Sequence, residues 1–515
     1  MDNKKDHSRI VKNSLFLYFR MILTLVVTLY TSRVVLNVLG VEDFGIYNVI
    51  GGVVTMMAFL SGAMSSATQR FLSFELGKGD VNQYSNVFKM SINIHLLIIL
   101  IVVLLAETIG LWFINNKLVI PVERLAAANL IFHYALFSFC CTIMSVPYNA
   151  AIISHEKMKA FAYISIIDVI LKLLVAFLLV RISNDKLESY GFMLAVVSFI
   201  TCFCYYLYSR SHFPETKFGV YWDKGLFLTL FGYTGWNLFG NLSSVATNQG
   251  INIVLNRFFG ALVNAARAIA FQVNAAIFGF ISSLLMSINP QIIKSYAKND
   301  VSYMHELIFA GARYTFFLLL LLSLPVIFET QSILGLWLGE APEYADLFIK
   351  LVLVESCIMC FSGTLMTAAQ ATGKIKLYQT IVGGLQLCNI PLSIAFLKIY
   401  SSPFIVCYIS ISISILALIL RLIFLKLLIG LSISDFYSNV IYPSVKAVVG
   451  SLIFVRLSFY GIEYFSLDFI YVLFLKIMTS LVITSLVIVF LCLNKTESAF
   501  LFSFLKRKLG MKGYE

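Results

Sequence analysis

Long apolar segments recur along the chain from about residue 12 to residue 493, separated by short polar connections. A hydrocarbon core about 30 Å thick requires roughly 20 helical residues, and fourteen segments of the sequence reach that length. The pattern therefore predicts an all-α integral membrane protein with about 14 transmembrane helices. The predicted helices are 12–38, 42–64, 86–113, 123–146, 158–181, 190–209, 226–256, 262–288, 303–328, 345–370, 376–397, 403–428, 441–460 and 468–493.

Polar side chains interrupt two of these segments at helical spacing. The first helix carries on one face Asn13, Arg20, Thr24, Thr28 and Thr31. The seventh helix carries a longer series, which we call the polar stripe: Asn237, Asn241, Ser244, Asn248, Asn252 and Asn256. Carboxamides along one face either bond neighbouring helices or line water. Because the polar stripe crosses most of the membrane, we interpret it as the lining of a wetted cavity, with interhelical bonding as the alternative.

Charged side chains inside apolar helices are costly in a membrane, so each one is a functional-site hypothesis. The predicted intramembrane cations are Arg20, Lys172, Arg257, Arg267 and Arg313. Arg33 and Arg70 lie nearer helix ends, from which long side chains reach the headgroups. A guanidinium is always charged and binds phosphate oxygens through two donors. Several arginines around one cavity would therefore form a phosphate or pyrophosphate site.

Acidic residues and histidines within the helices are candidates for ion coupling. Asp168 lies four residues before Lys172, a spacing that favours a local salt bridge. A second group could serve either to relay protons or to form polar contacts between helices. Its members are Glu107, Glu355, His95 and His133. Both roles remain open for this group.

The two halves of the chain resemble each other at a spacing near 220 residues. The run Val35–Asn37 followed by Gly40 matches the run Val254–Asn256 followed by Gly260, and the loop at 154–159 matches the loop at 371–376. An even number of crossings separates the copies, which predicts a 6+6 parallel repeat about an axis along the membrane normal. The predicted domains are six-helix lobes at 1–218 and 219–430, two additional helices at 431–493 and a basic cytoplasmic tail at 494–515.

Composition agrees with a membrane protein, since 60% of the residues are hydrophobic and 12% are charged. The net charge of +12 does not indicate a nucleic-acid partner, because the basic residues gather in alternate loops. This asymmetry predicts cytoplasmic N- and C-termini. The nine cysteines lie in or beside apolar helices, and the sequence has no cluster with metal-ligand or catalytic spacing. We therefore expect no metal, no cofactor and no enzymatic activity.

Three motifs and the 6+6+2 helix arrangement resemble the multidrug/oligosaccharidyl-lipid/polysaccharide exporter superfamily. The motifs are Thr31–Gly40, Asp43–Asn48, and Gln69–Phe71 before Gly77. Within the superfamily, the chain resembles the Wzx-type flippases of O-antigen and capsular polysaccharide synthesis. The resemblance implies a V-shaped cavity between two lobes, residence in the bacterial cytoplasmic (inner) membrane, and an undecaprenyl-pyrophosphate-linked oligosaccharide as substrate. It also implies contact with membrane lipids and with a polysaccharide polymerase or other assembly machinery.

Flippases of this kind hold the anionic headgroup with cationic cavity residues, and the resemblance therefore assigns functional candidates here. The substrate-binding candidates are Arg20, Asn237, Asn241, Asn248, Asn252, Arg257, Arg267 and Asn274, which follows Arg267 by seven residues. The ion-coupling candidates are Asp168, Lys172 and Glu355. By analogy with the lipid II flippase, the last two helices provide a groove for the lipid tail.

Three other functions compete with this interpretation. Multidrug exporters of this fold commonly carry an acidic cation-coupling residue in the first helix, whereas no acid lies between Lys12 and Glu42 in this chain. That difference favours an anionic substrate over a cation-coupled multidrug exporter. An integral-membrane polymerase or ligase would need a sizeable extracytoplasmic loop, and the longest one predicted, about 329–344, is short. A purely structural membrane protein would not need asparagines throughout its first and seventh helices.

Overall fold

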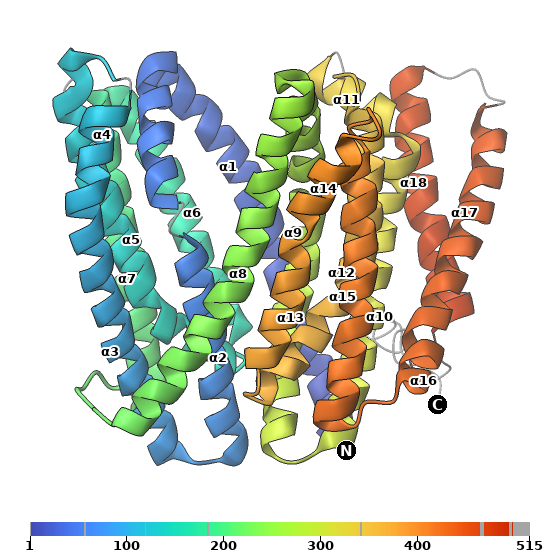
Figure 1. Cartoon of the computed structure of the whole chain (residues 1–515), viewed down its shortest axis with the longest axis horizontal. Coiled ribbons are helices and arrows are strands. Elements are labelled where there is room, and N and C mark those ends of the chain that lie inside the picture. Colours follow the sequence, from blue (N-terminus) through green and yellow to red (C-terminus); the bar gives the residue numbers. More distant parts are fainter. Residues whose placement is uncertain are drawn as a thin grey trace, which may run out of the picture. The chain divides into compact units, whose positions relative to one another are not determined.

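The computed structural model describes residues 2–55, 58–118, 120–182, 185–339, 342–463, 468–493 and 497. Apart from Glu497, the predicted basic tail at 494–515 lies outside the described residues. The helices (Figure 1) are α1 (Asp2–Thr55), α2 (Ala58–Lys78), α3 (Val81–Leu105), α4 (Leu111–Lys117), α5 (Leu125–Ser154), α6 (Met158–Arg181), α7 (Lys186–His212), α8 (Lys224–Phe259), α9 (Ala261–Ala297), α10 (Val301–Phe328), α11 (Thr330–Leu338), α12 (Ala345–Ala371), α13 (Lys376–Leu387), α14 (Asn389–Leu397), α15 (Ile405–Ile429), α16 (Ile433–Phe436), α17 (Tyr442–Glu463) and α18 (Phe469–Val487).

The predicted all-α membrane fold is confirmed. The described residues contain no strand, and 12 of their helices are long and apolar enough to cross a membrane. Those 12 correspond to all of the predicted helices except the second and the seventh. The seventh is α8, whose polar stripe lowers its apolar content. The second corresponds to the end of α1 and to α2, which carries Arg70 beside several hydroxyl and amide side chains.

Local chain breaks explain where helix boundaries differ from the prediction. α1 continues through residue 55 with a kink at Gly40, whose φ of 78° and ψ of 170° suit a residue without a Cβ. The predicted helix 376–397 is divided into α13 and α14. Pro391 lies two residues into α14 and has no N–H to donate to the preceding turn, so the helix is interrupted there. The sequence analysis also missed α11, which lies within the segment treated as a loop.

The backbone repeats its unusual conformations at the spacing found in the sequence. Positive φ values occur in pairs 217 or 220 residues apart: Gly40 and Gly260 (78° and 79°), Gly79 and Asn299 (78° and 59°), and Glu156 and Gly373 (57° and 76°). Such values are uncommon for residues other than glycine. Their recurrence at equivalent connections confirms the internal repeat.

Contacts divide the chain into two compact units that interleave along the sequence. The first unit contains residues 1–245, 286–300 and 370–383, and the second contains residues 246–285, 301–369 and 384–515. The division passes within α8, α9, α12 and α13, so each of these helices contributes residues to both units. The predicted lobes at 1–218 and 219–430 remain a prediction.

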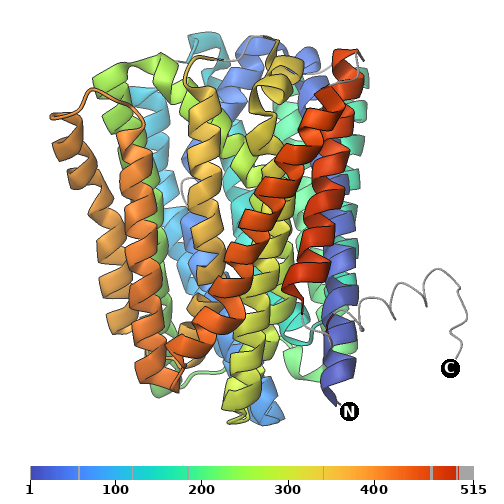
Figure 2. The same ribbon diagram turned by 90° about the vertical axis from the view of Figure 1, so that its right-hand side faces the viewer.

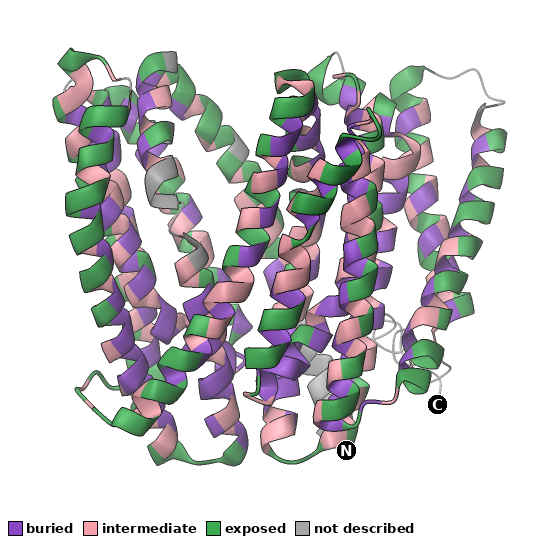
Figure 3. Ribbon diagram, viewed as in Figure 1, coloured by how far each residue is buried: buried purple, intermediate pink, exposed green. Residues whose placement is uncertain are grey.

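In the first unit, α5 occupies the interior and packs against α2, α3 and α7. Its inward residues include Phe132 and Tyr148, which are almost completely buried together with Phe88 of α3. Buried residues recur along α5 from Ala127 to Ser154, among intermediate and exposed ones (Figure 3). At one end of the unit, Arg124 bonds Asp43 of α1 at 2.9 Å and also Asp185 at the start of α7.

In the second unit, α9 and α12 contribute to a core that also contains Leu319 of α10 and Phe348 of α12. The two C-terminal membrane helices, α17 and α18, lie side by side and pack on α10 (Figure 2). Lys476 of α18 pairs with Glu329 at 3.1 Å, and both side chains are largely buried. Arg313 of α10 pairs with Glu497 and donates to the carbonyl of Asn439 at 3.2 Å. These contacts fix the C-terminal pair to the helices of the second repeat.

Candidate functional site

Arg20 lies on the polar face of α1, on a pocket within the first unit. The pocket has a volume of about 280 Å³ and is lined by Arg20, Met21, Thr24, Leu25 and Thr28. The Arg20 guanidinium lies 4.9 Å from the ring centroid of Phe161 on α6, and its buried Nε has no hydrogen-bond partner among the described residues. The structure thus presents a partly buried cation with an unused donor beside two threonine positions.

The Asp168 and Lys172 candidates form a local salt bridge on α6. The Lys172 Nζ to Asp168 Oδ2 distance is 2.7 Å, and Thr201 of α7 donates to the other carboxylate oxygen at 3.1 Å. This is the pairing that their spacing favours. Because both residues lie inside a helix that is apolar enough to cross a membrane, the pairing offsets the cost of placing either charge there. Its role in ion coupling remains a prediction.

Arg267 of α9 is the centre of a buried polar cluster in the second unit. It is 5% exposed, bonds the Asn252 carboxamide and lies 3.5 Å from the Asn248 oxygen, both on α8. Its guanidinium also stacks on the Phe271 ring at 4.3 Å. Glu355 of α12 is close enough to interact with it electrostatically. Three predicted site residues on α8 and α9 therefore lie together with one predicted coupling residue.

The same cluster continues to other helices of the second unit. Ser414 of α15 donates to Glu355 at 3.2 Å. The next residue on α12, Ser356, donates to Asn274 at 2.7 Å. Asn274 is thus held by a neighbouring helix, although it shares a helix face with Arg267. An ionised carboxylate needs such donors when it is removed from water.

The polar stripe of α8 divides into two environments. Asn237 is 3% exposed and accepts hydrogen bonds from Gln370 and Gln379 at 3.4 and 3.2 Å, which is the interhelical bonding considered as the alternative. Asn241 is partly exposed and close to Gly62, and Asn248 is exposed. Arg257, in the last turn of α8, is exposed and has no hydrogen bond or ion pair within the described residues. Among the described residues, Arg257 therefore has no bond to the cluster around Arg267.

Cysteine accessibility separates these environments. In a background without the native cysteines, we expect Asn241→Cys, Asn248→Cys and Asn252→Cys to react with small water-soluble thiol reagents if the polar stripe lines a wetted cavity, as the sequence predicts. Asn237→Cys should react far more slowly, as should Leu238→Cys, which serves as a control on another face. Labelling rates with and without substrate provide the measurement. Equal, slow rates at all five positions would make the whole stripe interhelical packing.

Arg70 is a polar centre that the sequence analysis missed. Instead of reaching the headgroups it is 6% exposed, and it donates to the carbonyls of Gln370 and Ala371 at 3.2 and 2.8 Å. Its guanidinium carbon also lies 4.6 Å from the ring centroids of both Phe71 and Phe74. Arg70 thus satisfies carbonyls at the C-terminus of α12, which the helix itself leaves unpaired. The snorkelling interpretation of Arg70 was wrong because its partners are about 300 residues away in the sequence.

A second cluster of the first unit surrounds Glu156, in the connection between α5 and α6. The Glu156 carboxylate pairs with Lys294 at 2.5 Å and accepts from Gln291 at 3.0 Å, both on α9. Its backbone carbonyl accepts from Asn13 of α1 at 3.2 Å. The adjacent Ser14 and Ser287 hydroxyls are 2.9 Å apart. Polar contacts therefore join the two repeats here. We use the name basal latch for these contacts around Glu156 together with those of Arg70 with Gln370 and Ala371.

The basal latch follows the internal symmetry. α2 and α9 are repeat equivalents, as are the connections at Glu156 and Gly373. Arg70 of α2 reaches the connection after α12, while Lys294 of α9 reaches the connection after α5. Between these contacts, a Cβ on Gly77 would lie 2.8 Å from the Cβ of Ala297, its own equivalent 220 positions later. Equivalent positions touch only near a symmetry axis, so this contact is what the predicted pseudo-two-fold relation of the repeats requires, and the axis itself stays a prediction.

His155, beside Glu156, contacts another acidic residue. Its Nε2 lies 2.9 Å from Glu215, and its ring stacks on Phe213 with centroids 4.0 Å apart. Burial lowers the pKa of His155, and the neighbouring Glu215 carboxylate opposes that shift. Burial thus outweighs the carboxylate and favours the neutral form of His155.

Comparisons with known proteins identify the family and the fold of the chain. A family model described as polysaccharide biosynthesis protein matches residues 10–296. An outward-facing multidrug resistance MATE family transporter of the MOP superfamily superposes with a TM-score of 0.72 at 12% identity, covering 82% of this chain and 96% of that one. A MOP superfamily transporter from Pyrococcus furiosus is described as having a binding pocket of reverse polarity. It superposes with a TM-score of 0.70 at 12% identity, covering 84% of this chain and 96% of that one. A search of curated proteins finds no match.

Proposed function

Because this chain belongs to the polysaccharide biosynthesis protein family and has the fold of MOP-superfamily transporters, we propose that it flips undecaprenyl-pyrophosphate-linked oligosaccharide repeat units across the cytoplasmic membrane. The family and the fold are those of transporters rather than of enzymes. The product would serve O-antigen, capsular or exopolysaccharide synthesis, and a polysaccharide polymerase or assembly machinery would receive it.

One observation carries the choice of substrate: each unit places an arginine on a polar helix face within the membrane. These are Arg20, with its unused Nε, and Arg267, with its asparagine partners. Permanent positive charge attracts a pyrophosphate and repels a cationic drug. The exposed stripe residues Asn241 and Asn248 would hydrogen-bond sugar hydroxyls. Arg257, exposed at the end of α8, would contact the headgroup as it enters or leaves.

Transport in this proposal proceeds by alternating access of the two lobes. The basal latch closes one end of the pathway, and it must open in each cycle for substrate to enter from that end. Its contacts suit this task because each is polar and can be replaced by contacts with water. Opening would expose Glu156, Lys294 and Arg70 to water together.

A cross-link tests the basal latch. The Ser14 and Ser287 hydroxyls are 2.9 Å apart, so cysteines at these two positions should form a disulfide with little movement. We expect oxidised Ser14→Cys/Ser287→Cys to lose transport and to recover it on reduction, in a background without native cysteines. Each single substitution is the matched control and should remain active. Full activity of the cross-linked protein would mean that this end does not open.

The membrane orientation proposed here has both termini in the cytoplasm. Cysteine labelling from outside intact cells should then modify Leu336→Cys, in α11, and spare Lys298→Cys, which follows α9 and is exposed. The reverse labelling pattern would invert the topology.

The alternative function is a cation-coupled multidrug exporter. Glu355 is the observation in its favour, because it is a partly buried carboxylate that accepts a hydrogen bond from Ser414 alone among the described residues. Binding assays on the purified protein distinguish the two. We expect an undecaprenyl-pyrophosphate oligosaccharide to raise the unfolding temperature, and cationic dyes to leave it unchanged. Stabilisation by the dyes alone would favour the exporter. An imposed proton or sodium gradient would then show whether Glu355 or Asp168 couples transport to an ion.

A further inference from the structure

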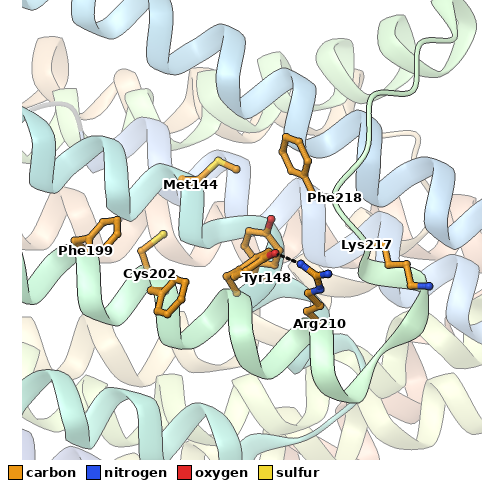
Figure 4. A pocket seen from close by; sticks show the side chains of 9 residues that line it. Met144, Tyr148, Phe199, Cys202, Arg210, Lys217 and Phe218 are labelled. Carbon is orange, nitrogen blue, oxygen red and sulfur yellow. Dashed lines mark hydrogen bonds between the residues drawn. The ribbon is translucent and has the colours of Figure 1, made fainter.

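A pocket separate from the basal latch and from Arg20 lies on the first unit, between α5, α7 and the connection to α8. Its volume is about 580 Å³. Its lining residues are Met144, Tyr148, Phe199, Cys202, Phe203, Tyr206, Arg210, Lys217 and Phe218. Figure 4 shows Arg210 and Lys217 at one end and Phe199 at the other. The pocket is therefore basic at one end and apolar along the rest of its length.

The apolar part consists of aromatic side chains along one face of α7. The rings of Phe199 and Phe203 stack with centroids 6.2 Å apart and an interplanar angle of 8°. The ring of Phe203 in turn stacks with that of Tyr206, with centroids 6.1 Å apart. Phe199, Phe203 and Phe218 are each about half exposed, although all three are large and apolar. In a membrane such a surface faces hydrocarbon.

The basic end has charge that the protein does not neutralise. Arg210 donates to the Tyr206 hydroxyl at 2.6 Å, a neutral partner, and neither Arg210 nor Lys217 forms an ion pair within the described residues. Glu215, the carboxylate nearest to them in sequence, is bonded to His155. Both cations are exposed and available to an anion.

The length of the pocket matches one leaflet of a bilayer. Phe199 and Arg210 are eleven positions apart on α7, which corresponds to about 16 Å along the helix axis. Half of a hydrocarbon core is about 15 Å. Arg210 lies in the last turn of α7, where a membrane helix meets the headgroups. A lipid with its phosphate at Arg210 would therefore extend an acyl chain past Phe203 to Phe199.

We propose that this pocket is a binding site for an anionic phospholipid of the membrane, with the phosphate held by Arg210 and Lys217 and one acyl chain on the aromatic face of α7. Basic pockets between transmembrane helices are known to select anionic headgroups. Lys217 and Phe218 belong to the connection between the two repeats, and the adjoining Tyr221 carbonyl accepts from Asn93 at 2.6 Å. The bound lipid would fasten this connection to α5 and α7.

Native mass spectrometry of the full chain tests the site, with phosphatidylglycerol as the probe. We expect the protein to retain one phosphatidylglycerol more strongly than phosphatidylcholine with the same acyl chains. Arg210→Gln/Lys217→Gln should weaken that retention about ten- to thirty-fold, since each basic residue near a membrane contributes to anionic lipid binding. The matched control is Lys157→Gln/Lys298→Gln, which removes two exposed lysines elsewhere and should leave retention unchanged.

Competing ligands identify what the site recognises. Glycerol phosphate has the headgroup phosphate without acyl chains, and equal competition by it would overturn the lipid proposal in favour of a simple phosphate site. Tighter retention of undecaprenyl pyrophosphate than of phosphatidylglycerol would assign the pocket to the transported lipid instead. Phe218→Ala removes only apolar surface from the pocket. It should therefore weaken the retention of phosphatidylglycerol and leave competition by glycerol phosphate, which has no acyl chain, unchanged. Unchanged retention in both the double variant and Phe218→Ala would exclude the site.

Discussion

Replacing Arg20 with alanine is expected to abolish transport while protein abundance stays near normal. Arg20 has an unused buried Nε on a pocket of about 280 Å³, so its removal leaves no bonded partner behind. The loss should appear in transport rather than in folding. Arg20→Lys should restore activity only in part, because an ammonium keeps the charge but lacks the two-donor geometry that fits a phosphate.

A second arginine on the same helix gives the matched control for Arg20. Arg33 is exposed and lies nearer the end of the predicted first helix, so Arg33→Ala should keep most of the activity. Export in cells, normalised to the amount of protein in the membrane, is the measurement. Full activity in Arg20→Ala would remove this residue from the mechanism.

Replacing Arg267 with methionine is expected to cost about 1.5–3 kcal/mol of stability, because it removes the charged donor of Asn252 and Asn248 and the cation that interacts with Glu355. Replacing both charges, in Arg267→Met/Glu355→Gln, should recover much of that loss, since no uncompensated charge then remains. Thermal unfolding of the purified variants measures both effects.

The exposed arginine of α8 serves as the control for this comparison. Arg257→Met should unfold close to the parent temperature, because Arg257 has no bonded partner within the described residues. If the losses of Arg267→Met and Glu355→Gln simply add in the double variant, the two side chains are not coupled.

Periodic features of the chain were predictable from sequence because they depend on residues that are close together along the chain. Membrane helices are defined by continuous apolar length, and α6 has the bounds 158–181 that the sequence predicts. The salt bridge between Asp168 and Lys172 follows from a four-residue spacing, which puts both side chains on one face. The repeat was predictable because Gly40 and Gly260 mark equivalent kinks in the backbone.

Contacts between distant segments were not predictable in the same way. Arg70 depends on carbonyls of Gln370 and Ala371, and nothing near Arg70 in the sequence indicates them. The polar stripe was a sound prediction of one helix face, but that face meets different neighbours along its length. Asn237 therefore bonds glutamines of the first unit, whereas Asn252 bonds Arg267 in the second. Periodicity specifies a face, and tertiary packing decides what the face contacts.

Flipping of a defined undecaprenyl-pyrophosphate oligosaccharide in proteoliposomes tests the central claim most directly. The sugar is labelled, and its appearance on the opposite leaflet is measured by access of an added sugar-modifying enzyme. We predict rapid flipping by the parent protein, none by Arg20→Ala, and none by oxidised Ser14→Cys/Ser287→Cys until it is reduced. Parent proteoliposomes that flip the lipid no faster than empty liposomes, while moving a cationic drug, would contradict the account.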